Sequence, residues 1–286
     1  MRLRSPLFAP GDSERKMTKA IASAADAVIL DLEDSVAAPA KTVARTMVPE
    51  VVRAHSSRGL IVRVNPRSTP WYLEDLAAVV PARPAAVMLP KCSGPEDLAV
   101  LDHHLEALEA AAGAPVGGIG VVAIVTETAG SVFNLGGYGS VASRLIAICF
   151  GAEDLSADLG ISPRRPDGSY PAPVVLARAQ TLVAAGALGV PAIDTPYPDH
   201  NDPSGLRREA DAAAADGFSG KILIHPAQID IVNAAFTPAP ESVRWAERVD
   251  AAFTANPDAG VFALDGKMID RPHWKLAQRI LTAAGQ

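Results

Sequence analysis

Short apolar runs alternate with longer amphipathic or alanine-rich segments along most of the chain. This alternation is typical of βα units, in which each short run is a buried strand and each longer segment a helix. Eight strands are expected, at Pro6–Ala9, Ala27–Asp31, Leu60–Val64, Ala85–Leu89, Val121–Val125, Leu145–Phe150, Val190–Asp194 and Lys221–Ile224. Eight such units in 286 residues favour an α/β fold of the TIM, or (β/α)8, barrel type over an open doubly wound sheet.

The pattern changes after His225-Pro226. The elements expected beyond this point are helices at about 227–235 and 241–255, an apolar run at 261–264, a turn at Asp265-Gly266 and a last helix from Pro272. We therefore expect residues 1–235 to form the barrel. Residues 236–286 are expected to form a C-terminal helical extension that packs on a neighbouring subunit. Within the barrel, Ser204 is expected to be the N-cap of a helix that ends before Asp216-Gly217.

Composition narrows the class of protein. About half of the positions are hydrophobic, which is enough for a large core, and the net charge of −6 argues against a nucleic-acid or membrane-surface protein. Cys92 and Cys149 form no CxxC motif and lie in or beside apolar runs, so they are expected to be reduced. No apolar stretch has the length of a signal peptide or membrane span, so we expect an unexported, cytoplasmic protein.

Polar residues gather just after the expected strands. Active sites of α/β barrels lie at the carboxyl ends of the strands, so these residues are the first candidates for function. They are Pro10-Gly11, Asp31-Leu32-Glu33-Asp34, Arg63-Val64-Asn65, Pro90-Lys91, Thr126-Glu127, Glu153-Asp154, Asp194-Thr195 and His225-Pro226. No GxGxxG after a strand, GxxxxGK[ST], GxSxG or HExxH motif occurs, so nucleotide, P-loop, serine-hydrolase and zincin sites lack their parts.

Two of these acids are candidate metal ligands. Glu127 and Asp154 each follow a strand, and Mg²⁺ usually takes one or two protein carboxylates and leaves positions for water and substrate. Glu153 competes with Asp154 for this role. The acids of the 31–34 turn could hold metal-bound waters, or could form a solvated turn.

The basic residues at the strand ends each allow two interpretations. Arg63 lies in an apolar run, so it either pairs with a buried acid such as Asp31 or binds a substrate carboxylate. Lys91 either forms a Schiff base or pairs with the acids of the 31–34 turn. His225 is a lone histidine at the rim, more typical of packing or hydrogen bonding than of a metal ligand.

Together, several motifs resemble the citrate lyase β-subunit-like, or CoA-ester lyase, branch of the HpcH/HpaI aldolase superfamily. They span nearly the whole chain in that family's order. The matching stretches are Leu7-Phe8-Ala9-Pro10-Gly11-Asp12 with Arg15 and Lys19, Val28–Val36, Val62-Arg63-Val64-Asn65, Met88-Leu89-Pro90-Lys91, Thr126-Glu127-Thr128, Gly151–Leu155, Ile224–Gln228 and Leu264–Pro272.

The resemblance implies a TIM barrel with Mg²⁺ on Glu127 and Asp154, and with Arg63 as a catalytic residue that also binds the substrate carboxylate. It implies that Asp270 is catalytic and reaches the barrel of an adjacent subunit in a homotrimer or a multiple of it.

The resemblance further implies a site for the CoA part of the substrate. Arg15 and Lys19 match positions that bind it, and Ile224 and His225 match a rim segment that also touches it. Two cations one helical turn apart can meet phosphates, although they can equally form a solvated helix face.

The implied reaction is the cleavage or formation of a 3-hydroxyacyl-CoA of the malyl, citramalyl or citryl type, which yields a 2-oxo acid and an acyl-CoA. Alternatives are a CoA-independent aldolase, a subunit active only with a carrier protein, and an acyl-CoA thioesterase. The chain departs from the family at Glu127-Thr128-Ala129-Gly130, where a basic residue often stands. Substrate choice is expected to differ there.

Overall fold

The computed structural model describes residues 1–140, 143–257 and 260–285. The chain divides into two compact units, Met1–Asn233 and Ala234–Gln286. Each unit is described by itself.

The first unit is built around an eight-stranded parallel sheet in which the strands follow one another in chain order. The strands are β1 (Pro6–Pro10), β2 (Ala27–Asp31), β3 (Ile61–Arg63), β4 (Ala86–Leu89), β5 (Gly120–Ile124), β6 (Leu145–Cys149), β7 (Ala192–Asp194) and β8 (Gly220–Lys221). Leu223, just after β8, closes the sheet on β1: its N–H donates to Pro6 O at 2.8 Å and its carbonyl accepts from Phe8 N at 2.9 Å. The predicted TIM barrel is thereby confirmed.

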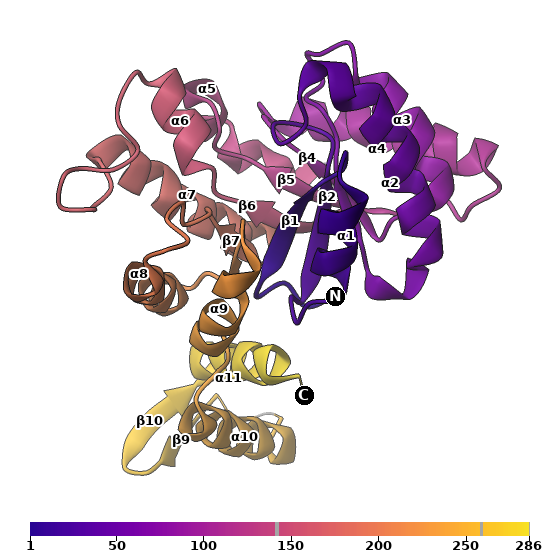
Figure 1. Cartoon of the computed structure of the whole chain (residues 1–286). Helices are drawn as coiled ribbons and strands as arrows, with labels where there is room; N and C mark the ends of the chain where they lie inside the picture. The colour runs from indigo at the N-terminus through magenta and orange to yellow at the C-terminus, as the bar shows by residue number, and fades with distance from the viewer. Residues whose placement is uncertain (141–142, 258–259, 286) are drawn as a thin grey trace. The chain divides into compact units, whose positions relative to one another are not determined.

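Helices lie outside the strands (Figure 1). Those of the first unit are α1 (Glu14–Ile21), α2 (Lys41–Ala54), α3 (Tyr72–Val79), α4 (Pro95–Ala111), α5 (Ala129–Val132), α6 (Ala152–Asp158), α7 (Ala172–Leu188) and α8 (Pro203–Asp216), and α9 (Ile229–Ala235) crosses into the second unit. The expectation that Ser204 caps α8 was wrong. Asp202 is the N-cap, and its Oδ1 accepts from Gly205 N at 2.8 Å, because Pro203 occupies the first helical position and needs no donor partner.

Alternate residues of the strands fill the inside of the barrel. Successive side chains of a strand point to opposite faces, so one set from each strand meets at the axis. This buried cluster contains Leu3, Ala27, Ile29, Ile61, Ala86, Met88, Val122, Ile124, Ala147, Cys149, Ile193 and Ile222. Asp31 and Arg63 continue the inward positions of β2 and β3 by one step, which places both at the carboxyl end of the barrel interior.

The seam of the barrel demands a glycine. A Cβ at Gly220 would collide with the carbonyl oxygens of Leu3 and Arg4, and Lys221 N donates to Arg4 O at 2.9 Å. The backbones of β8 and the segment before β1 therefore approach more closely than a side chain would permit.

The second unit is a small helical layer with a hairpin. It contains α10 (Pro240–Ala255), β9 (Val261–Leu264), β10 (Lys267–Asp270) and α11 (Arg271–Ala284). The two strands pair antiparallel, and the turn between them uses positive φ at Asp265 and Gly266. Its core is formed by Ala246, Val249, Phe253, Ile269 and Ala277. Among the described residues, no helix combines the length and apolarity needed to cross a membrane.

Candidate active site at the carboxyl ends of the strands

Arg63 and Asp31 form a buried pair at the mouth of the barrel. Arg63 Nε and Nη2 donate to the two carboxylate oxygens of Asp31 at 2.7 and 2.8 Å, and the guanidinium lies 4.3 Å from the ring centroid of Phe8. Burial alone would raise the pKa of Asp31, but these hydrogen bonds hold it below its ordinary value. Of the two interpretations of Arg63, the pairing with the buried Asp31 is present. Its Nη1 points past Asp31 and lies 2.9 Å from Glu33 Oε2.

Glu33 links this pair to Lys91. The Glu33 side chain is almost fully buried, and its Oε1 accepts from Lys91 Nζ. Lys91 Nζ also lies 3.2 Å from Asp34 Oδ2. Burial would lower the pKa of Lys91, but the bond to Glu33 raises it above its ordinary value. A protonated, ion-paired Lys91 matches the interpretation as a partner of the 31–34 turn and is unsuited to forming a Schiff base, which needs a neutral amine.

Glu127 is held by the backbone of Lys91. Lys91 N donates to Glu127 Oε2, and the backbone of Lys91 has a left-handed conformation with φ 48°. Only 4% of Glu127 is exposed, and burial, together with the nearby charges of Asp154 and Glu33, raises its pKa to about 8. Gly151 leaves room for this side chain, since a Cβ there would lie 2.6 Å from Glu127 Cγ.

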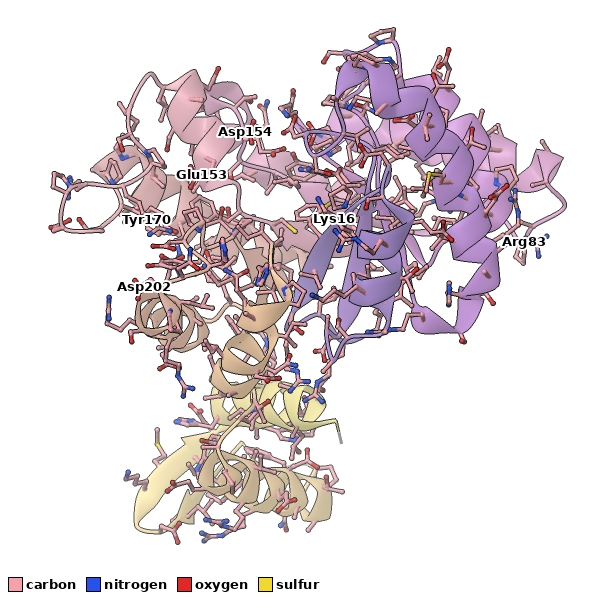
Figure 2. The ribbon with its side chains drawn as sticks, viewed as in Figure 1. Lys16, Arg83, Glu153, Asp154, Tyr170 and Asp202 are labelled. Atoms are coloured by element: carbon pink, nitrogen blue, oxygen red, sulfur yellow. The ribbon has the colours of Figure 1, made fainter. Side chains whose placement is uncertain are left out.

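Asp154, rather than Glu153, faces the same cluster. Both residues lie in the first turn of α6 (Figure 2). Asp154 Oδ1 lies 3.5 Å from Lys91 Nζ, whereas Glu153 has no ion pair among the described residues. Lys91 thus contacts Glu127 through its backbone and Asp154 through its side chain, which places the two predicted metal ligands around one residue.

The donor set fits Mg²⁺. The acids around Lys91 outnumber the cations, and a buried carboxylate with a strongly raised pKa is one that lacks a counter-charge. No group of three or more histidine, cysteine, aspartate or glutamate side chains suited to a metal occurs in the described part of the chain. Two carboxylates with no such third ligand suit Mg²⁺, which keeps several waters, better than zinc.

A supporting network beneath the 31–34 turn was not predicted. Lys41 Nζ donates to the carbonyl oxygens of Leu32 and Glu33 and to Asn65 Oδ1, each at 2.7 Å. Asn65 Nδ2 in turn donates to Leu32 O at 2.8 Å and to Asp75 Oδ2 at 2.6 Å. This network fixes the backbone that presents Glu33. A lysine at the start of an amphipathic helix gives no signal of such a role.

Asp194 does not join the site. Its neighbour Ile193 points into the barrel, so Asp194 faces the outer helices, where its Oδ2 accepts from Lys221 Nζ at 2.9 Å. Lys221 also donates to Glu209 Oε1 at 2.6 Å, and Arg178 Nε donates to Asp194 Oδ1 at 3.2 Å. These residues form a structural ion network between the strands and the helical layer.

The residues predicted to bind CoA lie on two elements. Arg15 and Lys19 are exposed on α1, one turn apart. Gln228 Oε1 accepts from the backbone N–H groups of Ile224 and His225 at 3.0 and 3.1 Å, which fixes the segment after β8. The His225 ring packs on His200 with centroids 4.8 Å apart, as expected for a packing residue.

The segment after Glu127 is folded into a capped turn. Thr128 is the N-cap of α5 and forms a capping box with Ser131, and Ala129 N donates to Asp158 Oδ2 at 2.7 Å. The small residues at the position where the family often has a basic one are therefore part of a short helix. Its link to substrate choice stays a prediction.

Asp270 belongs to the second unit. It ends β10 and is the N-cap of α11, and its Oδ1 lies 2.5 Å from His273 Nδ1. About a third of the carboxylate side chain is exposed. The contact with His273 holds Asp270 in one orientation at the end of the hairpin.

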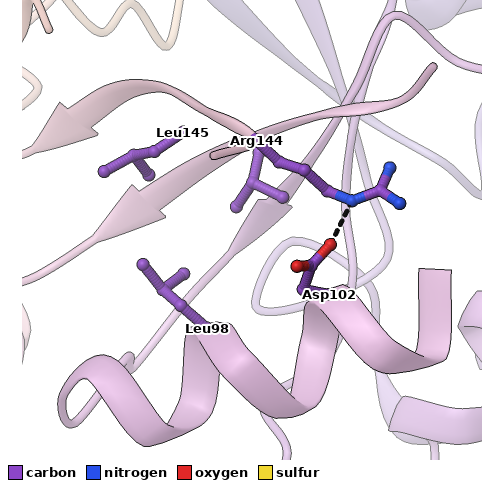
Figure 3. A pocket seen from close by; sticks show the side chains of 5 residues that line it. Leu98, Asp102, Arg144 and Leu145 are labelled. Atoms are coloured by element: carbon purple, nitrogen blue, oxygen red, sulfur yellow. Dashed lines mark hydrogen bonds and ion pairs between the residues drawn. The ribbon is translucent and has the colours of Figure 1, made fainter. Parts of the chain in front are cut away.

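The opposite end of the barrel contains a small pocket with structural ion pairs. It is lined by Leu98, Asp102, Val121, Arg144 and Leu145, and Arg144 bonds to Asp102 across it (Figure 3). Arg144 Nη1 and Nη2 also donate to the buried Glu109 at 2.9 and 2.8 Å. The charge of Arg144 is thus balanced by Asp102 and Glu109. The pocket lies at the amino-terminal ends of the strands, and residues at that end of a TIM barrel typically contribute to stability.

Known proteins resemble the chain over almost its full length. The family model for HpcH/HpaI aldolase/citrate lyase matches residues 4–226. Citrate lyase subunit beta from Leuconostoc mesenteroides subsp. cremoris is 35% identical over 98% of this chain and 93% of its own. A (3S)-malyl-CoA thioesterase from Cereibacter sphaeroides is 36% identical over 98% of this chain and 94% of its own length. The crystal structure of CitE from Mycobacterium tuberculosis with magnesium, acetoacetate and coenzyme A aligns with a TM-score of 0.77 and 36% identity, covering 99% of this chain and 98% of that one.

Proposed function

This chain belongs to the HpcH/HpaI aldolase/citrate lyase family, and we propose that it is a Mg²⁺-dependent carbon–carbon lyase acting on a 3-hydroxyacyl-CoA thioester. The substrate class is that of malyl-, citramalyl- or citryl-CoA. The observation that carries the proposal is that Glu127 and Asp154 both contact Lys91. Glu33 pairs with both Lys91 and Arg63, so it links these two basic residues. CitE from Mycobacterium tuberculosis, one of the similar proteins of known structure, was crystallised with magnesium, acetoacetate and coenzyme A.

The reaction is a reversible retro-aldol or retro-Claisen cleavage. The bond between C2 and C3 of the hydroxyacyl chain breaks, and its electron pair goes to C2. The C3 hydroxyl loses its proton, and C3 becomes the carbonyl carbon of the 2-oxo acid. C2 gains a proton and becomes the methyl or methylene carbon of the acyl-CoA.

Glu127 and Asp154 would hold the Mg²⁺. When bound, Mg²⁺ supplies a Lewis acid that stabilises the developing charge on oxygen. Arg63 would orient the substrate carboxylate with Nη1, which would be shared with Glu33 Oε2 at 2.9 Å, while Asp31 fixes the guanidinium plane through Nε and Nη2. A planar guanidinium held on one edge leaves its other donors pre-oriented, which lowers the cost of positioning substrate.

Asp270 would exchange the proton at C2. About a third of its side chain is exposed at the end of the hairpin, and His273 orients the carboxylate. We infer that it acts on the barrel of a neighbouring subunit in a homotrimer or a multiple of it. Exposed apolar side chains of the second unit support an oligomer, since Val261, Met268 and Leu276 are each at least half exposed.

The CoA part would bind at the rim. Arg15 and Lys19 present two exposed cations on one face of α1, suited to phosphate groups. The fixed segment at Ile224 and His225 would contact the same moiety. The domain division proposed with this assignment is a barrel at 1–235 and an extension at 236–286. The buried, unbonded cysteines Cys92 and Cys149 support action in a reducing, cytoplasmic compartment.

A thioesterase is the second candidate, since a malyl-CoA thioesterase is as similar to this chain as the lyase subunit is. The test incubates the purified chain with Mg²⁺ and malyl- or citramalyl-CoA and measures the 2-oxo acid and free thiol separately. The lyase produces 2-oxo acid without thiol. Thiol without 2-oxo acid identifies a thioesterase.

Two further substrates complete the assay. Cleavage of a hydroxy-oxo acid without CoA would identify a CoA-independent aldolase. Activity confined to a thioester on a carrier protein would identify a subunit of a larger complex, and either outcome would contradict the proposed CoA-ester lyase.

A further inference from the structure

Lys91 makes contacts of two kinds. Its backbone N–H donates to Glu127 Oε2. Its side chain instead reaches Glu33, Asp34 and Asp154, with Nζ 3.2 Å from Asp34 Oδ2 and 3.5 Å from Asp154 Oδ1. The backbone therefore positions Glu127, whereas the ammonium pairs with the neighbouring acids Glu33, Asp34 and Asp154.

The two candidate ligands keep their places without the ammonium. Glu127 is fixed by the N–H of Lys91 and by the space that Gly151 leaves beside its Cγ. The backbone of Asp154 is fixed by its position in the first turn of α6. Removal of the Lys91 side chain would thus leave the ligand geometry and take away only a positive charge.

The ammonium has acid partners besides Asp154. Glu33 and Asp34 come from the turn after β2, whereas Asp154 comes from α6, so Lys91 bridges two sides of the barrel mouth. When Asp154 binds a cation, Glu33 and Asp34 still pair with Lys91. The ammonium can therefore leave Asp154 without becoming an unpaired charge.

We propose that Lys91 is a built-in competitor for the divalent cation, which weakens Mg²⁺ binding and withdraws from Asp154 onto Glu33 and Asp34 as the cation enters. This inference rests on the proposed function of Glu127 and Asp154. A positive charge close to an anionic site opposes a dication, and its removal is worth about a tenfold change in affinity even when the two charges interact through the dielectric of bulk water.

The experiment is a titration of the purified protein with Mg²⁺ by calorimetry and with Mn²⁺ by electron paramagnetic resonance. Lys91→Met removes the ammonium and keeps most of the stem, and it should bind about tenfold tighter than the wild type. Lys91→Gly removes the whole side chain and suits the left-handed backbone that presents the N–H to Glu127, so it should bind tighter as well. Lys91→Arg keeps the charge and should bind with unchanged affinity.

Thermal unfolding gives a second readout that does not depend on turnover. The metal-free Met variant should be less stable than the wild type because its acids lose a counter-ion. Its Tm should rise more on addition of a fixed Mg²⁺ concentration, because a ligand that binds the folded state more tightly stabilises it more. Should either variant fail to fold, the other carries the test.

Equal or weaker metal binding by both the Met and Gly variants would overturn the proposal and would mean that the ammonium organises the ligands. Failure of the proposed metal site has a different signature. In that case Glu127→Gln would bind Mn²⁺ as tightly as the wild type, whatever the behaviour of the Lys91 variants.

Discussion

Asp31 holds Arg63 along one edge, with the carboxylate oxygens 2.7 and 2.8 Å from Nε and Nη2. Because both side chains are buried, this contact sets the direction in which Nη1 can meet a substrate.

Asp31→Asn removes the charge that fixes this direction. The guanidinium should turn or shift, and kcat/KM for the thioester should fall by about 100-fold because small misplacements of a positioning group carry costs of that size. Steady-state kinetics measure this loss. The matched control is Asp26→Asn, which breaks the similarly two-pronged pair of Asp26 with Arg4 before β2. Its kcat/KM should not change, and an equal loss in both variants would contradict the role given to Asp31.

Neutralising either metal ligand should abolish tight cation binding. Glu127→Gln and Asp154→Asn keep the shape of each side chain but lose the charge, and Mn²⁺ affinity should fall by about 100-fold or more. Electron paramagnetic resonance measures the free and bound ion. Glu153→Gln, one residue from Asp154 on the same helix turn, should bind Mn²⁺ normally. A loss confined to the Glu153 variant would reassign the ligand.

Asp270→Asn should bind Mg²⁺ and 2-oxo acid like the wild type and lose turnover by about 100-fold or more, as expected for a general acid–base residue. Mixing this variant with Glu127→Gln after dissociation should restore part of the activity. If Asp270 serves a neighbour's barrel, some mixed oligomers contain a site in which both residues are intact. A mixture no more active than its components would place Asp270 and its barrel in one subunit.

Gly151→Ala should damage the metal site through packing alone. Its Cβ would lie 2.6 Å from Glu127 Cγ and 3.1 Å from Ile124 Cγ2, so Glu127 must move. Mn²⁺ affinity should fall while the barrel stays folded, as circular dichroism can show. Gly130→Ala, in α5, meets no atom within 4 Å and provides the control. Normal affinity in the Gly151 variant would mean that Glu127 is not held where the metal binds.

Glu109 should make stability depend on acid pH. Burial alone would raise its pKa, but the bonds from Arg144 and from the N–H groups of Gly117 and Ile119 hold it below the ordinary 4.5. A carboxyl whose pKa is lowered by folding stabilises the protein fully above its unfolded pKa. This contribution is lost as the pH falls toward the folded value.

Glu109→Gln should therefore lower the free energy of unfolding by about 3 kcal/mol at pH 7, because a buried Arg144 loses its partner charge. The difference from the wild type should shrink as the pH falls below about 4.5, where the carboxyl of the unfolded chain takes up a proton, and should disappear below the lower pKa of the folded state. Urea unfolding at several pH values measures both effects. Glu106→Gln, on the exposed face of α4, should change neither, and a constant difference across pH would exclude Glu109 as the titrating group.

The barrel could be predicted because strands buried on both faces produce unbroken apolar runs. All eight strands lie within their predicted runs or overlap them, from Ala27–Asp31, which is unchanged, to β8, which is shorter than expected. Because both faces of each strand are buried, the sequence does not alternate between apolar and polar residues and does not show which way each side chain points. With apolar residues on both faces, the sequence could not tell that Asp31 points inward and Asp194 outward.

Features that depend on long-range contacts were also missed. Lys41 and Asn65 lie far apart in the sequence and meet under the 31–34 turn. The strand at Lys267–Asp270 is short and half polar, and only its pairing with Val261–Leu264 defines it. The metal ligands could be proposed from the sequence because each follows a strand, whereas the contact of both with Lys91 required the fold.

The close approach of Gly220 to Leu3 and Arg4 has a consequence for biosynthesis. The barrel closes between β1 and the segment from β8 to Leu223, which lie at opposite ends of the barrel sequence. During synthesis β1 therefore leaves the ribosome long before β8 does. Until residues 220–223 emerge, β1 is an edge strand with unpaired N–H and C=O groups, and such edges invite pairing with other chains. Closing the ring is therefore the step with the longest loop and the greatest exposure to aggregation.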